Sequence, residues 1–180
     1  MRKCRPMKIV IAPDSFKESM SAREAAEAIQ EGFSKILPST VEYDLIPMAD
    51  GGEGTTEALM EALNAKTIAT TVKDPLYRDI TAKYAYASSQ KIAIIEMAAA
   101  SGLDLLTKEE RNPLKTTTFG TGQLINHALE LGAQKIILGI GGSATNDGGV
   151  GMLQALGVKF LDSNGHSIEP GGLHLSLIHI

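Results

Sequence analysis

The sequence has few of the features that define disulfide-bonded, secreted and membrane proteins. Its 180 residues include a single cysteine, Cys4, so no disulfide can form within the chain, and a reducing compartment fits this composition. No apolar stretch approaches the roughly 20 residues that span a bilayer, and the run IVIA behind the basic start is too short for a signal peptide. These absences predict a cytoplasmic protein without a membrane partner.

Positive charge is also scarce. The formal net charge is −4 and the sequence pI is about 5.6, so the chain has no general attraction for nucleic acid. The histidines have no ligand-like spacing with the cysteine or the carboxylates, which argues against a zinc site. Neither the G-x-x-x-x-G-K-S/T element of P-loop NTPases nor the G-x-S-x-G element of α/β-hydrolases occurs. The composition favours an ordinary globular domain, or one large lobe of a bigger enzyme.

Several apolar runs have the length and residue types of buried strands. The runs at residues 8–12, 91–97 and 135–140 are rich in isoleucine and valine, and a further strand is expected at residues 158–161. Helix-like segments lie between most of these runs. This alternation predicts an α/β fold of the doubly wound class, with a mostly parallel sheet and helices on both faces.

Two of the expected helices begin at recognisable caps. Ser21 is followed three residues later by Glu24, which is the pattern of a capping box. Thr118 is expected to cap a helix over residues 119–131. These caps fix where the loops before the helices end.

Four loops near the expected strand ends are unusually polar or rich in glycine. In doubly wound folds, ligands bind at the carboxyl ends of the strands. We therefore expect the functional site among residues 14–19, 49–55, 116–122 and 139–149.

The strongest signal is GIGGSATNDGG at residues 139–149, which follows a strand, contains five glycines and leads into a helix. Glycines let backbone N–H groups approach phosphate oxygens, and a helix N-terminus adds partial positive charge. Ser143, Thr145 and Asn146 offer further donors, and Asp147 is a candidate for holding Mg²⁺ or for accepting a proton. The stretch predicts a phosphate-cradling loop; the alternative is a tight turn without a ligand.

The same stretch also fits a dinucleotide-binding pattern. Residues 139–144 match G-x-G-x-x-A, and Asp162 lies about 20 residues further on, where a ribose-binding carboxylate would sit. However, residues 146–149 interrupt the position where a Rossmann helix should already be running. An NAD-dependent oxidoreductase therefore stays open as an alternative.

Two other loops carry charged side chains. Asp50 and Glu53 lie among three glycines and are candidates for a base or a metal ligand, although acidic residues also favour a helix N-terminus without any ligand. Asp14, Ser15 and Lys17 follow the first strand. Lys17 is a candidate for neutralising a transferring phosphoryl group or binding a substrate carboxylate, with an ordinary exposed lysine as the alternative.

The loop at residues 116–122 opens a helix with four hydroxyl groups and two glycines. Two interpretations have equal weight. Either the loop binds an anion, or it is a helix cap with spare threonines.

Six stretches lie in order between residues 8 and 158: KIVIAPDSFKES, PMADGGEGT, VKDPLYR, IEMAAASGLDLL, RNPLKTTTFGTGQLI and GIGGSATNDGGVGMLQALGV. Taken together, they resemble the motifs of the glycerate kinase type 1 family and occur in the family's order. One small departure is Glu18, where many members have glycine.

The resemblance implies phosphorylation of D-glycerate with ATP and Mg²⁺, on a two-domain α/β fold about twice this length. Both 2-phosphoglycerate and 3-phosphoglycerate are open as products. Lys17, Asp50 and Asp147 are the candidate catalytic residues, with Asp147 also the candidate Mg²⁺ ligand. The other residues carried over bind substrate or phosphate, and they are Asp14, Ser15, Gly51, Gly52, Thr118, Gly120, Thr121, Gly141, Gly142, Ser143, Ala144, Thr145, Asn146, Gly148 and Gly149.

The resemblance also implies an incomplete enzyme. We expect an N-terminal extension at residues 1–6, a glycerate-kinase-like region at residues 7–172 that lacks the family's C-terminal half, and a non-native tail at residues 173–180. Such a chain would be either a kinase or a nucleotide-binding fragment without activity. Its small-molecule partners would be glycerate and ATP, and its oligomeric state is open.

Overall fold

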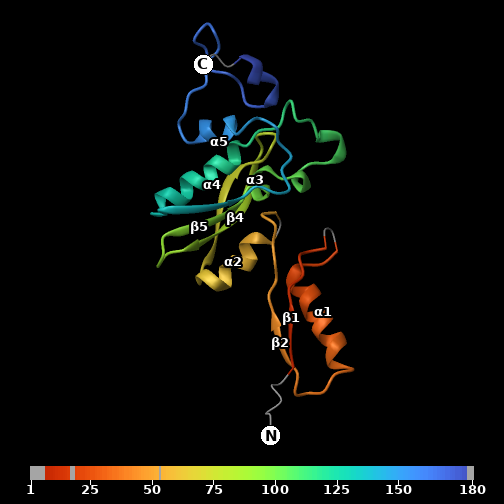
Figure 1. Ribbon diagram of the computed structural model, residues 1–180. Helices are drawn as coiled ribbons and strands as arrows, with labels where there is room; N and C mark the ends of the chain where they lie inside the picture. The colour runs from red at the N-terminus through yellow and green to blue at the C-terminus, as the bar shows by residue number, and fades with distance from the viewer. Residues whose placement is uncertain (1–6, 17–18, 53, 178–180) are drawn as a thin grey trace. The chain divides into compact units, whose positions relative to one another are not determined.

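The computed structural model describes residues 7–16, 19–52 and 54–177 (Figure 1). The chain divides into two compact units, Met1–Asp50 and Gly51–Ile180. Four of the residues singled out from the sequence, Cys4, Lys17, Glu18 and Glu53, lie outside the described residues.

The smaller unit consists of two parallel strands and one helix. Its strands β1 and β2 pair with Lys8 opposite Glu42. The capping box is confirmed, because the Glu24 N–H donates to the Ser21 hydroxyl at 3.2 Å and the Ser21 N–H donates to the Glu24 carboxylate at 2.8 Å. The elements are β1 (Lys8–Ile11), α1 (Ala22–Ser34) and β2 (Glu42–Leu45).

The larger unit contains a sheet and the helices that cover it. No helix within the described part of the chain is both long and apolar enough to cross a bilayer. The elements are α2 (Thr55–Leu63), β3 (Lys66–Lys73), β4 (Asp79–Ala87), β5 (Ile92–Glu96), α3 (Ala98–Ser101), η1 (Leu103–Leu105), η2 (Lys108–Glu110), α4 (Phe119–Glu130), β6 (Lys135–Gly139), α5 (Val150–Ala155) and η3 (Gly172–Leu177).

The sheet of the larger unit has the order β3-β4-β5-β6. β5 and β6 are parallel, with Ile92 opposite Lys135, whereas β3–β4 and β4–β5 are antiparallel. The α/β class is confirmed, and the parallel pairs are β1–β2 and β5–β6. The sheet is mixed because the turn after Lys73 is short enough to close β3 and β4 into a hairpin.

The strand expected at residues 158–161 does not form. Leu161 makes a single bridge to Ser167, because a turn in between folds this segment back on itself. The turn is closed by the Asp162 carboxylate, which accepts the N–H groups of Asn164 at 2.8 Å and of His166 at 2.9 Å.

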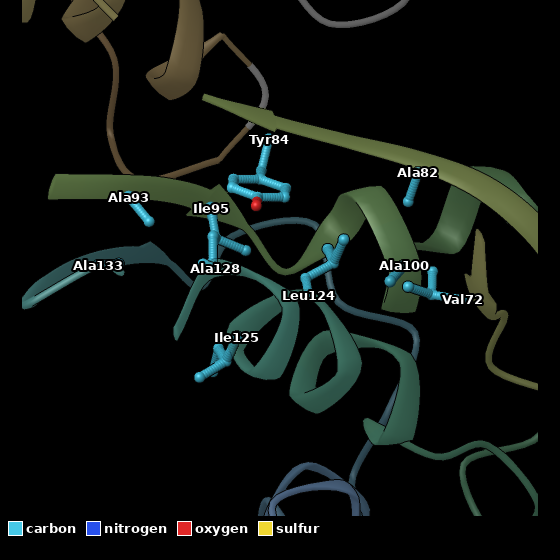
Figure 2. Close-up of a cluster of buried hydrophobic side chains, with 10 residues drawn as sticks. All are labelled: Val72, Ala82, Tyr84, Ala93, Ile95, Ala100, Leu124, Ile125, Ala128 and Ala133. Carbon is cyan, nitrogen blue, oxygen red and sulfur yellow. The ribbon is translucent and has the colours of Figure 1, made fainter. Parts of the chain in front are cut away.

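The core of the larger unit lies between the sheet and α4 (Figure 2). Leu124 from α4 packs against Tyr84 and Ile95 from the strands, and all three side chains are fully buried. The opposite face of β4 and β5 is in contact with α2 (Figure 1). Helices therefore cover both faces of this sheet, as expected for strands that are apolar on both sides.

Candidate functional site

In the smaller unit, the candidate residues follow the two strands. Asp14 and Ser15 come after β1, and Asp50 comes after β2. The Met48 N–H donates to the Pro13 carbonyl at 2.9 Å, so both loops lie at one edge, as parallel strands require. The exposed Asp14 carboxylate accepts the Ser15 N–H at 2.7 Å.

In the larger unit, two glycine-rich segments touch through their backbones. The Gly141 N–H donates to the Gly51 carbonyl at 2.9 Å. A Cβ added at Gly139 would lie 2.6 Å from that carbonyl oxygen, and one added at Gly141 would lie 2.6 Å from the Gly52 Cα. Glycine is needed at these positions because no side chain fits between the two segments.

Asp147 ties the glycine-rich loop to the start of α4. Its carboxylate is 1% exposed and accepts bonds from five donors. These donors are the Thr118 N–H at 2.8 Å, the Thr118 hydroxyl at 2.9 Å, the Thr117 hydroxyl at 3.4 Å, the Gly149 N–H at 3.0 Å and the Gly151 N–H at 3.1 Å.

This geometry gives Asp147 a positioning role. A buried carboxylate with its acceptor sites occupied is well satisfied where it is, and it would have to abandon several bonds to reach a metal or a substrate. It therefore does not fit the expected roles of Mg²⁺ ligand and proton acceptor. No group of three His, Cys, Asp or Glu side chains that could hold a metal ion occurs among the described residues.

The predicted threonines also form hydrogen bonds that hold the glycine-rich loop. Thr118 occupies the cap position of α4 but makes no side-chain cap bond, because its hydroxyl donates to Asp147 and accepts the Met152 N–H at 2.9 Å. The Thr116 hydroxyl donates to the Ala144 carbonyl at 2.8 Å. The hydroxyl groups of this stretch hold the loop in place.

Sequence reasoning missed Ser101 as part of this arrangement. Its hydroxyl lies 2.7 Å from that of the predicted residue Thr121, and its carbonyl accepts the Ala144 N–H at 2.8 Å. Next to it, the Leu103 N–H donates to the Gly142 carbonyl at 3.0 Å. The available signal was the run of small residues AAASG after β5, which permits a close approach of two backbones.

Two more glycines allow the helices to approach their neighbours. A Cβ at Gly120 would lie 1.8 Å from the Lys73 carbonyl oxygen, and one at Gly151 would lie 2.1 Å from the Thr117 hydroxyl. Gly120 was expected to bind phosphate, and the structure shows that it permits α4 to pack against β3.

The loop nevertheless presents backbone donors on this rigid base. The N–H groups of Gly142, Ser143, Asn146 and Gly148 donate no hydrogen bond to any residue that the structure describes. Gly142, Asn146 and Gly148 are exposed, and both glycines have positive φ. The Ser143 and Thr145 hydroxyls pair with each other at 2.8 Å. N–H groups on a fixed loop can donate hydrogen bonds to an anion without reorganisation of the loop.

The dinucleotide alternative does not fit this geometry. A Rossmann loop opens directly into its helix, whereas α5 begins at Val150, well beyond residues 139–144, and has only 6 residues. Asp162 is engaged in its own turn, where the backbone N–H groups of His166 and Asn164 hold the pKa of its carboxyl below the usual value.

The family model of the glycerate kinase family matches residues 9–180, and the chain belongs to this family. The resemblance inferred from the loops is confirmed. A mixed α/β unit with a glycine-rich loop after a parallel strand is therefore the N-terminal part of the fold that this family shares.

Individual relatives cover the chain almost completely. It is 57% identical over 164 residues to a glycerate kinase of Halalkalibacterium halodurans, which is 91% of this chain and 43% of the relative. It is 54% identical over 173 residues to the glycerate 2-kinase of Escherichia coli, which is 96% of this chain and 45% of the relative. The chain thus spans less than half the length of these relatives.

A solved structure has the same fold. The crystal structure comes from Salmonella typhimurium and is provisionally assigned as a glycerate kinase 2. It superposes with a TM-score of 0.80 at 52% identity and covers 96% of this chain and 47% of that one.

Proposed function

We propose that the chain holds the phosphates of ATP in a kinase that phosphorylates D-glycerate. The observation that carries the proposal is the glycine-rich loop, which Asp147 anchors and in which the N–H groups of Gly142, Ser143, Asn146 and Gly148 donate to no described residue. Membership of the glycerate kinase family supports the reaction class and the acceptor. A cytoplasmic location belongs to the same proposal.

The loop would act through its backbone. Phosphate oxygens accept hydrogen bonds from amides that are already fixed, so little ordering is required when the negative charge arrives. Asp147 contributes indirectly, because its bonds to Gly149 and Gly151 fix the last turn of the loop.

The glycerate hydroxyl oxygen would attack the γ-phosphorus while the bond to the bridging oxygen of ADP breaks. Of the two carboxylates expected to take the hydroxyl proton, we favour Asp50, because Asp147 is buried and fully engaged. Asp14 and Ser15, at the same strand edge of the smaller unit, would bind glycerate. Lys17 would balance charge on the transferring phosphoryl group.

We propose 2-phosphoglycerate as the product, because the relative from Escherichia coli is named a glycerate 2-kinase. Mg²⁺ accompanies ATP in most phosphoryl transfers. The residue expected to hold it, Asp147, does not fit that role, so no step is assigned to the metal.

The proposal is tested by an ADP-release assay with ATP and D-glycerate, run beside an NADH titration of the same chain. ADP formation that needs D-glycerate supports the kinase, and the position of the new phosphate is then read from the phosphorus NMR spectrum of the product. ATP binding without turnover identifies a nucleotide-binding fragment instead. NADH binding without any response to ATP contradicts the proposal.

A further inference from the structure

The stretch DPLYR holds a tyrosine in a backbone conformation that costs free energy. Tyr77 has a φ of 69°, in the left-handed region that bulky L side chains rarely adopt. It lies in the turn between β3 and β4, where glycine or asparagine would be unstrained. Such strain persists only where the surroundings over-determine it, and it tends to occur at ligand sites.

The surroundings of this turn fix it from two sides. The Asp74 carboxylate is buried and accepts the N–H groups of Leu76 at 2.8 Å and of Arg78 at 2.9 Å, and the Arg78 guanidinium pairs with it. From the other side, the Thr117 N–H donates to the Pro75 carbonyl at 3.0 Å. The backbone therefore holds Tyr77 in place whether or not its ring makes a contact.

The ring of Tyr77 is 42% exposed. Its centroid lies 5.0 Å from that of Phe119, with the planes tilted by 47°, and the Lys73 ammonium lies 5.5 Å from it. The same ammonium pairs with the Asp79 carboxylate at 2.8 Å. A fixed and half-exposed aromatic ring suits a planar ligand, because the ring can stack against it.

Two clefts meet at this ring. One, of about 440 Å³, lies between Tyr77, Lys115, Thr117 and Pro170. The other, of about 250 Å³, lies on the Phe119 side and shares Tyr77 and Pro170. The larger cleft is within the size range of small-ligand pockets.

Thr117 links the larger cleft to the glycine-rich loop. It lines the cleft, and its hydroxyl lies 3.4 Å from the carboxylate of Asp147, which anchors the loop. A ligand in this cleft would therefore lie beside the residues that anchor the proposed phosphate-binding loop.

We propose that Tyr77 stacks against the purine base of the nucleoside triphosphate whose phosphates the glycine-rich loop holds; this inference rests on the proposed function. The Lys115 ammonium in the cleft wall is placed to attract the phosphates, and the Glu169 carboxylate is placed to accept a ribose hydroxyl. Glycerate is too small and too polar to use the apolar ring faces, which favours the base as the occupant.

The test compares the affinities of the chain for ATP and for inorganic tripolyphosphate, measured by calorimetry in wild type and in the Tyr77→Gly and Tyr77→Phe variants. Glycine suits the left-handed backbone, so Tyr77→Gly is expected to fold with an unchanged or higher melting temperature. It should weaken ATP binding about tenfold or more and leave tripolyphosphate binding unchanged, because only the base loses its stacking partner. Tyr77→Phe keeps the ring and should retain ATP affinity.

Lys91→Gly is the matched control for relief of backbone strain, because Lys91 also has a positive φ, of 55°, in the turn before β5. Phe33→Leu is the matched control for loss of an exposed ring, because Phe33 is 42% exposed on α1. Both should bind ATP as wild type does.

The outcomes separate this inference from the function on which it rests. If ATP and tripolyphosphate bind and Tyr77→Gly changes neither affinity, the base site is refuted and the phosphate site stands. If neither ligand binds the wild-type chain, both fail. A melting temperature that falls in Tyr77→Gly while ATP affinity per folded molecule stays constant would show that the ring serves the fold alone.

Discussion

The candidate carboxylates of the two units differ in their burial and in their hydrogen bonds. In the smaller unit, the carboxylate of Asp14 is exposed at the end of β1 and accepts the N–H of its neighbour Ser15. In the larger unit, the carboxylate of Asp147 is buried and accepts hydrogen bonds from five donors, which lie at the starts of α4 and α5. The difference separates residues that remain accessible to a ligand from residues that shape the loop presented to it.

The units also differ in how they cover apolar side chains. Ile36, in the turn after α1, is 85% exposed, and Val10 on β1 and Phe33 on α1 are also exposed. In the larger unit, Tyr84 and Ile95 are fully buried under α4. Burial of apolar surface is the main source of folding free energy, so the larger unit should hold most of the chain's stability.

The sharpest way to break this comparison is to remove the charge at Asp147. Asp147→Asn replaces an acceptor with an amide whose N–H₂ would face other donors, so the free energy of unfolding should fall by about 3–5 kcal/mol. The measurement is urea unfolding followed by circular dichroism.

Asp14→Asn is the matched control in the smaller unit. Its carboxylate is exposed, so the expected change is within about 0.5 kcal/mol. Equal effects of the two substitutions would remove the distinction between shaping and accessible carboxylates.

A second pair contrasts the glycines of the two units. Gly120→Ala places a methyl group 1.8 Å from a backbone oxygen, so α4 must move away from β3, at an expected cost of about 2–3 kcal/mol. Gly32→Ala lies in a helix with nothing within 4 Å of the added Cβ, and should stabilise the chain by up to about 1 kcal/mol. The two melting temperatures should therefore shift in opposite directions, and a shift in the same direction contradicts the packing described for α4.

The third prediction concerns alkaline pH. Burial raises the pKa of Tyr84 to about 12, so between its unfolded pKa near 10 and this value the unfolded chain releases a proton that the folded chain keeps. Stability should be unaffected by this residue below about pH 10 and should fall by up to roughly 2 kcal/mol as the pH rises toward 12. Urea titrations at several pH values check it.

Tyr84→Phe supplies the control for this prediction. It cannot ionise, so it should be less stable than wild type at neutral pH, because it loses the hydrogen bond to His127 at 2.9 Å, and the difference should narrow at alkaline pH. A constant difference across this range would show that ionisation of Tyr84 is not linked to unfolding.

The smallest expected effect lies in the smaller unit. Ser21→Ala removes the hydroxyl that accepts the Glu24 N–H, and should destabilise α1 by about 1 kcal/mol. Hydrogen exchange should accelerate at the first turn of α1 and stay unchanged in α4. Acceleration in both helices would show that the two units unfold as one.

Local signals in the sequence predicted much of this. The capping box at Ser21 and Glu24 depends on side chains three residues apart, and the apolar runs are defined by their length and residue types, so both could be predicted without tertiary contacts. The family was recognisable from its loops, and the α/β class is confirmed.

The hydrogen-bond partner of each polar group could not be predicted from the sequence. Asp147 and Thr118 are 29 residues apart, and their bond exists only because α4 and the loop pack together. The same applies to the segment at residues 158–161, where strand propensity was overruled because Asp162 closes a turn instead of the segment reaching a sheet edge. Tyr77 lies within the stretch VKDPLYR, but its left-handed backbone is visible only in the structure.

The central claim is that the loop at residues 139–149 holds the phosphates of ATP. The most direct test is amide hydrogen exchange of this chain with and without ATP, with NADH as the comparison ligand. The account predicts slower exchange at Gly142, Ser143, Asn146 and Gly148 with ATP and no change there with NADH. ATP binding that leaves these amides unprotected, or protection confined to other loops, would contradict it.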